Sequence, residues 1–65
     1  MSEYQFAMWL AGEIKAGMIL RTTAVLEYRQ RYSVDFMDAL LSIDIAIGDW
    51  NAGKRYSDVQ EDIYV

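Results

Sequence analysis

Residues 33–53 read SVDFMDALLSIDIAIGDWNAG, and this stretch carries the signals of a helix at both ends and along one face. Ser33 is a residue type favoured at the N-cap, and Gly53 can adopt the left-handed conformation that ends a helix. Between them, large apolar residues recur every three or four positions, which at about 100° per residue places them on one face. We therefore predict a helix over about residues 34–52 whose core row is Phe36, Leu40, Ile43, Ile47 and Trp50.

The preceding segment, about residues 3–31, consists mostly of good helix formers and follows Ser2, a suitable N-cap. Its apolar row has the same spacing, and the expected core members are Ile14, Met18, Val25 and Tyr28. Glycine weakens a helix by about 1 kcal/mol relative to alanine, so this segment is either one helix or two with a break near Gly12 or Gly17. Residues 20–32 also show some strand-like alternation, but no turn residues bound them, and we favour a helix.

The fold class expected from these elements is all-α, in a single domain of 65 residues. A tight turn near Ser33 would pack the two long segments as an antiparallel helical hairpin, in which facing residue numbers sum to about 65. Ser57 and Gln60 match the S-x-x-Q capping box, which predicts a short C-terminal helix over about residues 58–63.

Two charged residues interrupt the apolar rows of this hairpin. Arg21 lies in the first row, and Asp44 lies within the apolar arc of the second helix. The register places them level with each other, and a buried carboxylate is tolerated only when it has a partner. We therefore predict a buried or interface ion pair between Arg21 and Asp44, within one chain or across a dimer. The alternative is that both side chains reach solvent separately.

The same register leaves the first eleven residues beyond the end of the second helix. These residues are too apolar to remain in water, and their types are those enriched at protein interfaces. The predicted partner or dimer interface comprises Tyr4, Phe6, Met8, Trp9, Leu10, Val59 and Ile63. A short chain has a thin core, and this one has no cysteine or histidine to supply a disulfide or a zinc site, so we expect a homodimer.

Several kinds of chemistry are excluded or disfavoured. Residues 48–54 spell the phosphate-loop string G-x-x-x-x-G-K, but Arg55 follows where Ser or Thr is needed and the string ends a helix. Without histidine or cysteine, no spacing places a nucleophile beside a base, so we expect no enzyme, no cofactor and no metal site. The N-terminal apolar run is interrupted by charges, so we expect no membrane span, no secretory signal and a cytoplasmic location.

The function that best fits this inventory is binding to another protein and modulating it, as an inhibitor or adaptor. Small size and few catalytic groups are typical of regulators encoded by phages and plasmids. One alternative is a nucleic-acid-associated regulator that uses Arg29, Arg31, Lys54 and Arg55, although the net charge of −4 and the helix ends argue against nucleic acid. The other is an acidic mimic of nucleic acid that uses Asp35, Asp38, Asp49, Asp58, Glu61 and Asp62.

Overall fold

A computed structural model of the chain describes residues 1–58. These residues form three α-helices and a short 3₁₀ turn, and no strand, so the all-α prediction is confirmed. The elements are α1 (Glu3–Lys15), α2 (Arg21–Tyr32), α3 (Phe36–Asn51) and η1 (Tyr56–Asp58). The predicted C-terminal helix lies outside the described residues, except that its first residue, Asp58, ends η1.

The chain breaks between α1 and α2 at Gly17, one of the two positions that the sequence left open. Gly17 has a φ of 77°, which a residue without a Cβ adopts at little cost. The Gly17 N–H donates to the Ile14 carbonyl at 3.0 Å, and the Met18 N–H donates to the Glu13 carbonyl at 2.9 Å. These two bonds form a Schellman motif, which satisfies the last carbonyls of α1 and stops the helix. Gly12 remains inside α1.

The same motif ends α3. Gly53 has a φ of 104°, its N–H donates to the Trp50 carbonyl at 2.9 Å, and the Lys54 N–H donates to the Asp49 carbonyl at 3.0 Å. The start of α3 differs from the prediction, because Asp35 and not Ser33 is the N-cap.

The Asp35 carboxylate accepts the Asp38 N–H at 2.9 Å, which satisfies one of the free amides of the first turn. Ser33 instead takes a left-handed conformation with a φ of 54° and closes α2. A residue that ends one helix in this conformation cannot also provide the extended N-cap of the next.

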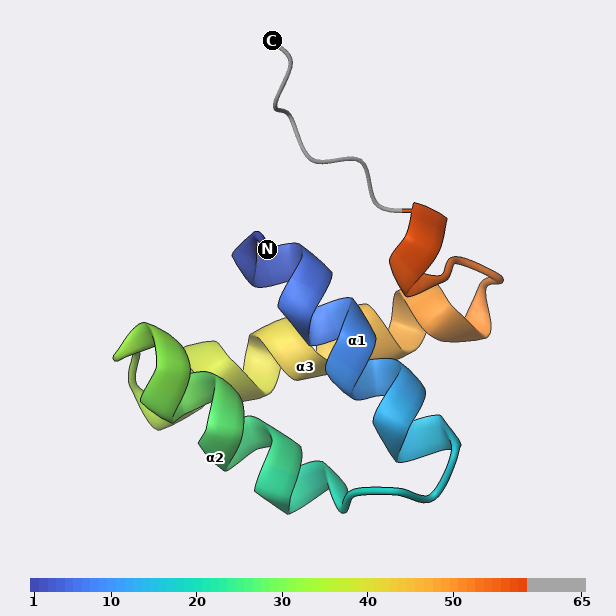
Figure 1. The fold of residues 1–65 in the computed structure, drawn as a ribbon. Coiled ribbons are helices and arrows are strands. Elements are labelled where there is room, and N and C mark those ends of the chain that lie inside the picture. Colours follow the sequence, from blue (N-terminus) through green and yellow to red (C-terminus); the bar gives the residue numbers. More distant parts are fainter. Residues whose placement is uncertain (59–65) are drawn as a thin grey trace, which may run out of the picture.

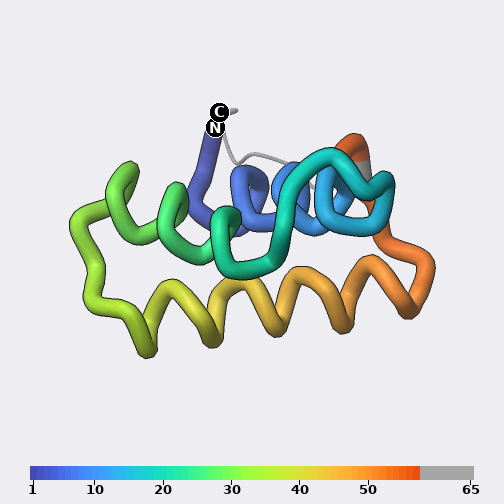
Figure 2. Tube along the Cα trace, turned by 90° about the horizontal axis from the view of Figure 1, so that it is seen from below, coloured from blue at the N-terminus to red at the C-terminus, as the bar shows by residue number. Residues whose placement is uncertain are grey.

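α1 and α2 lie on the same side of α3, as Figure 2 shows with α3 in yellow to orange along one edge of the molecule. In Figure 1, α1 crosses over α3, and the chain reverses direction between α2 and α3. The expectation that the first eleven residues extend beyond the second helix is therefore wrong. The left-handed turn at Gly17 redirects the chain, so that α1 folds back and packs against α3.

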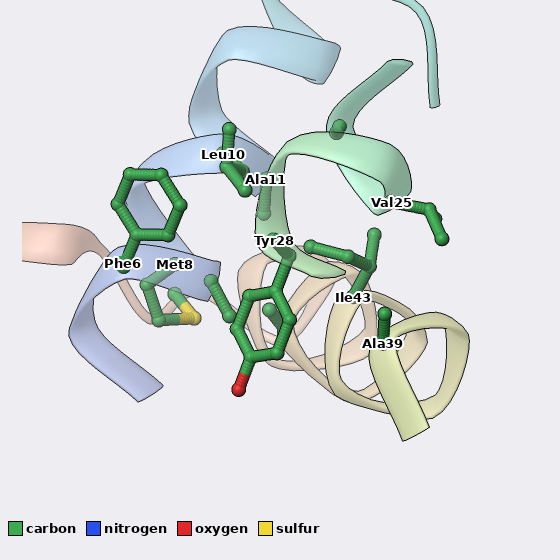
Figure 3. Packing of buried hydrophobic residues seen from close by; sticks show 11 residues of the cluster. Phe6, Met8, Leu10, Ala11, Val25, Tyr28, Ala39 and Ile43 are labelled. Carbon is green, nitrogen blue, oxygen red and sulfur yellow. The ribbon is translucent and has the colours of Figure 1, made fainter. Parts of the chain in front are cut away.

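The core lies between the three helices (Figure 3). Its buried members are Phe6, Ala7, Met8, Leu10, Ala11, Ala24, Val25, Tyr28, Ala39, Ile43 and Ala46. Of the predicted core, three residues belong to this set and four more pack against it partly buried, namely Ile14, Leu40, Ile47 and Trp50.

Two core predictions are wrong, because the side chain of Met18 is 71% exposed and that of Phe36 is 46% exposed. Met18 lies in the turn that follows α1, outside the helix that the prediction assumed. Phe36 is exposed because the buried face of α3 is rotated toward Ala39 and Ala46. These small side chains let a neighbouring helix approach closely.

Candidate functional site

The predicted N-terminal interface is largely internal. Phe6, Met8 and Leu10 are 8%, 0% and 0% exposed, so these three residues belong to the core of the chain and not to a surface. The Phe6 ring packs against the rings of Tyr28 and Tyr32, with centroid distances of 6.4 and 5.9 Å.

Two of the remaining predicted interface residues are accessible in the described structure. Trp9 is 40% exposed, and its ring lies 5.8 Å from that of Phe6. Tyr4 is half-buried. Val59 and Ile63 lie outside the described residues. What is left of the predicted interface is therefore a single exposed aromatic ring and one partly covered one.

A different apolar surface is exposed on α3. Met37, Leu41 and Ile45 are 59%, 54% and 58% exposed, and their spacing of four residues places them on one side of the helix. α1 and α2 lie on one side of α3, and no other described helix lies on its opposite side (Figure 2). Ile45 stands at the margin of this exposed surface, because it also lines a pocket with residues of α1 and α2. We refer to Met37, Leu41 and Ile45 as the outer stripe.

The sequence contains a signal for the outer stripe that the prediction of one apolar row did not use. α3 carries large apolar residues around most of its circumference, whereas a helix with only one buried face shows polar residues on the other. The predicted row from Phe36 to Trp50 did not include Met37, Leu41 and Ile45. A helix that is apolar on both sides has a partner on both sides or exposes one of them to water.

One edge of the outer stripe carries the Arg21–Asp44 salt bridge. Arg21 begins α2, and its guanidinium donates to the carboxylate of the residue that the hairpin register placed opposite it. The side chains are 52% and 43% exposed, so the pair lies at the surface and not in the core. Asp44 thus contributes little net charge to this edge of α3.

The other edge is acidic. At about 100° per residue, Asp38 and Asp49 lie within roughly 20° of each other and next to Ile45 on the side that faces α1. The Tyr4 hydroxyl donates to the Asp49 carboxylate. Partial burial raises the pKa of Tyr4, and the hydrogen bond to Asp49 raises it further. The Lys54 ammonium lies 5.4 Å from the centroid of the Tyr4 ring, at the C-terminal end of this edge.

A pocket of about 250 Å³ opens beside Ile45, where α1, α2 and α3 meet. Its lining residues are Glu3, Tyr4, Ala7, Tyr28, Ser42 and Ile45. Tyr28 is only 3% exposed, and its hydroxyl donates to the Glu3 carboxylate over 3.4 Å. Figure 3 shows this hydroxyl pointing away from the core residues Leu10 and Ile43. Burial raises the pKa of the Tyr28 hydroxyl above its ordinary value of 10.0.

The basic residues considered for nucleic-acid binding are separated in space and mostly engaged with aromatic rings. The Arg31 guanidinium lies 4.6 Å from the Phe6 centroid, and the Arg55 guanidinium lies 3.9 Å from the Trp50 centroid and donates to the Trp50 carbonyl at 2.9 Å. Arg29 lines a depression of about 490 Å³ near the turn between α2 and α3.

The helix α3, with 16 residues and a length of about 24 Å, separates Arg29 and Arg31 at one end from Lys54 and Arg55 at the other. The four basic residues therefore do not form one continuous patch. Among the acidic residues of the proposed mimic, Asp35 caps α3, and Glu61 and Asp62 lie outside the described residues.

Residues 1–58 contain no group of three metal-ligating side chains that could hold an ion. In the same range, none of the helices is both long and apolar enough to cross a membrane. Comparisons with protein-family models, curated proteins and solved structures found no match. The functional inference therefore rests on the surface of the chain itself.

Proposed function

We propose that this chain is a small helical protein-interaction module that binds and modulates another protein through the outer stripe of α3. The observation that supports this proposal is the exposure of three large apolar side chains on one side of a well-capped helix. Contiguous exposed apolar surface with a polar border marks interaction sites more often than isolated apolar residues do. The role is one of binding and not of catalysis.

The position of the outer stripe suits this role. In the proposal, α2 and α3 act as an antiparallel hairpin, which the Arg21–Asp44 salt bridge helps to hold in register. α1 packs on the inner side of α3, and within residues 1–58 no helix lies on the outer side (Figure 2). An apolar row at intervals of four residues on a rigid helix is the pattern with which one helix docks against another.

The other candidate functions have less support. A homodimer through Phe6, Met8 and Leu10 would require the core to open. Binding of nucleic acid would rely on basic residues that lie at opposite ends of α3. For the acidic mimic, Asp35 already accepts a hydrogen bond as the N-cap of α3, and Glu61 and Asp62 lie outside the described residues.

Affinity capture with matched variants tests the proposed function. The wild-type chain, Leu41→Glu and Leu26→Glu are immobilised and exposed to lysate of the native host, and the bound proteins are quantified by mass spectrometry. Leu26 provides the control because it is 49% exposed on α2, close to the 54% of Leu41, but lies outside the outer stripe. Thermal melts first establish that all three chains fold.

The expected result is a host protein that wild type and Leu26→Glu retain and Leu41→Glu loses. Met37→Glu, with Met18→Glu as its control, repeats the comparison at a second position of the stripe. Equal capture by the stripe variants and their controls would contradict the proposed function, and so would the absence of any specifically retained protein.

A further inference from the structure

We propose that the outer stripe receives an amphipathic α-helix of another protein whose apolar face is bordered on one edge by lysine or arginine. One of these basic side chains enters the pocket beside Glu3. This inference rests on the proposed function and adds the chemistry of the partner. It is drawn from the unequal charge of the two edges of the stripe and from the lining of the pocket.

The two edges of the stripe differ in charge. α3 contains Asp38, Asp44 and Asp49 and no basic side chain. Arg21 pairs with Asp44 on one edge, so that edge is close to neutral. Asp38 and Asp49 lie on the other edge, and Glu3 of α1 joins them where it lines the pocket with Ile45. Lys54 lies at the C-terminal end of this edge, near Tyr4, so three carboxylates there stand against one ammonium and the edge is acidic. A partner helix that fits both edges is therefore basic on one side of its apolar face and uncharged on the other.

The pocket suits the end of a basic side chain. Glu3 offers a carboxylate, and the hydroxyls of Tyr28 and Ser42 offer further acceptors, whereas ammonium and guanidinium groups are donors only. Ala7 and Ile45 form an apolar wall, against which the aliphatic part of lysine or arginine packs. The buried Tyr28 hydroxyl, which reaches Glu3 only over 3.4 Å, lies where an incoming donor would meet it.

A second copy of the chain fits this surface less well than a basic helix. Parallel pairing of two α3 helices about a two-fold axis places the acidic edge of each helix beside the neutral edge of the other, which offers it no countercharge, whereas antiparallel pairing places the same edge of each helix side by side. The Asp38 and Asp49 carboxylates of both copies would then share one edge, and the net charge of −4 on each chain adds to the repulsion. The charge of the stripe therefore favours a different protein as the occupant.

Two synthetic helical peptides of about 15 residues test this proposal. Both carry leucines at every third or fourth position, and one has lysine and arginine along one edge of that face where the other has glutamate. Binding to the complete chain is measured by the fluorescence anisotropy of labelled peptide at low and high salt. We expect the basic peptide to bind, more weakly at high salt, and the acidic peptide not to bind.

Variants of the chain locate the contact. Leu41→Glu is expected to weaken binding of the basic peptide by at least about tenfold, because it removes a buried leucine contact. Glu3→Gln is expected to weaken it by about two- to fivefold, the range for an exposed ion pair. The controls Leu26→Glu and Glu27→Gln change the same residue types on α2 and should leave the affinity unchanged.

The outcomes separate this inference from the proposed function. If wild type captures a host protein that Leu41→Glu does not capture, but the basic peptide does not bind, the proposed function stands and the proposal of a basic partner helix is overturned. Equal binding of the two peptides, or unchanged binding by Glu3→Gln, overturns the charge complementarity. Sedimentation of the chain alone as a dimer that Leu41→Glu dissociates would identify a second copy as the occupant and overturn the proposal.

Discussion

Replacing Gly12 with alanine should destabilise the fold, although alanine is the better helix former. A Cβ placed on Gly12 would lie 2.8 Å from Cζ3 and 3.0 Å from Cη2 of Trp50, whereas ordinary contacts of this kind begin near 3.4 Å. The Trp50 ring packs partly buried against the core, and the Arg55 guanidinium lies 3.9 Å from its centroid, so moving the ring disturbs both contacts. Accommodating the methyl group therefore requires α1 and α3 to separate or the indole to leave its rotamer.

The size of the effect follows from two opposing contributions. Alanine in place of glycine within a helix favours folding by about 1 kcal/mol. Forcing a methyl group into a well-packed site costs about 1–3 kcal/mol, and a rigid ring as the neighbour argues for the upper half of that range. The free energy of unfolding should fall by about 1–2 kcal/mol, which corresponds to a fall in Tm of roughly 4–16 °C for a chain of this size.

Gly48→Ala provides the matched control, because Gly48 lies inside α3 and, within residues 1–58, no side chain or neighbouring element comes within 4 Å of the place that its methyl group would take. The free energy of unfolding of this variant should rise by about 1 kcal/mol, and its Tm by roughly 4–8 °C. Thermal and urea melts followed by far-UV circular dichroism measure both variants. If Gly12→Ala were stabilised as much as Gly48→Ala, the close packing of α1 against Trp50 would be refuted.

Three further predictions concern the Arg21–Asp44 salt bridge, the buried Tyr28 and the turn at Gly17. A double-mutant cycle of Arg21→Ala and Asp44→Ala should give a coupling energy of no more than about 1 kcal/mol, smaller at high salt, and strictly additive losses would contradict the salt bridge. Burial raises the pKa of Tyr28 above its usual 10.0, so its contribution to stability is complete below pH 10 and is lost as the pH rises further. Urea melts between neutral and alkaline pH should show this loss in wild type and a reduced loss in Tyr28→Phe, and equal slopes would contradict it. In Gly17→Ala the free energy of unfolding should fall by about 1–2 kcal/mol, because the φ of 77° at this position is unfavourable for alanine even though the space around the methyl group is open. Thermal melts measure this change, and an unchanged Tm would contradict the left-handed turn.

The features that depend on short stretches of chain could be predicted from the sequence. Gly53 ends α3 as predicted, and Gly17 is one of the two positions at which a break was left open. Glycine adopts the left-handed conformation at both positions without strain, and this property is local. The contact between Arg21 and Asp44 followed from counting residues across a turn between two helices of equal rise.

The direction of α1 and the rotation of α3 could not be predicted in this way. A glycine turn indicates that a helix stops, but the path of the next segment depends on contacts far along the chain. The buried face of α3 is centred on Ala39, Ile43 and Ala46, and alanines add little to an apolar row although they allow close packing. The outer stripe was therefore missed, because α3 carries large apolar residues on two sides and the prediction treated only one of these sides as significant.

The central claim is that the outer stripe of α3 is the surface that binds a partner. It is tested most directly by NMR titration of the ¹⁵N-labelled chain with a protein that wild type retains and Leu41→Glu loses in the affinity capture. The largest changes in amide chemical shift are expected at Met37, Leu41 and Ile45, with a second group at Glu3 and Ser42 around the pocket. Changes concentrated around Trp9, or around Arg29 at the turn between α2 and α3, would contradict the claim.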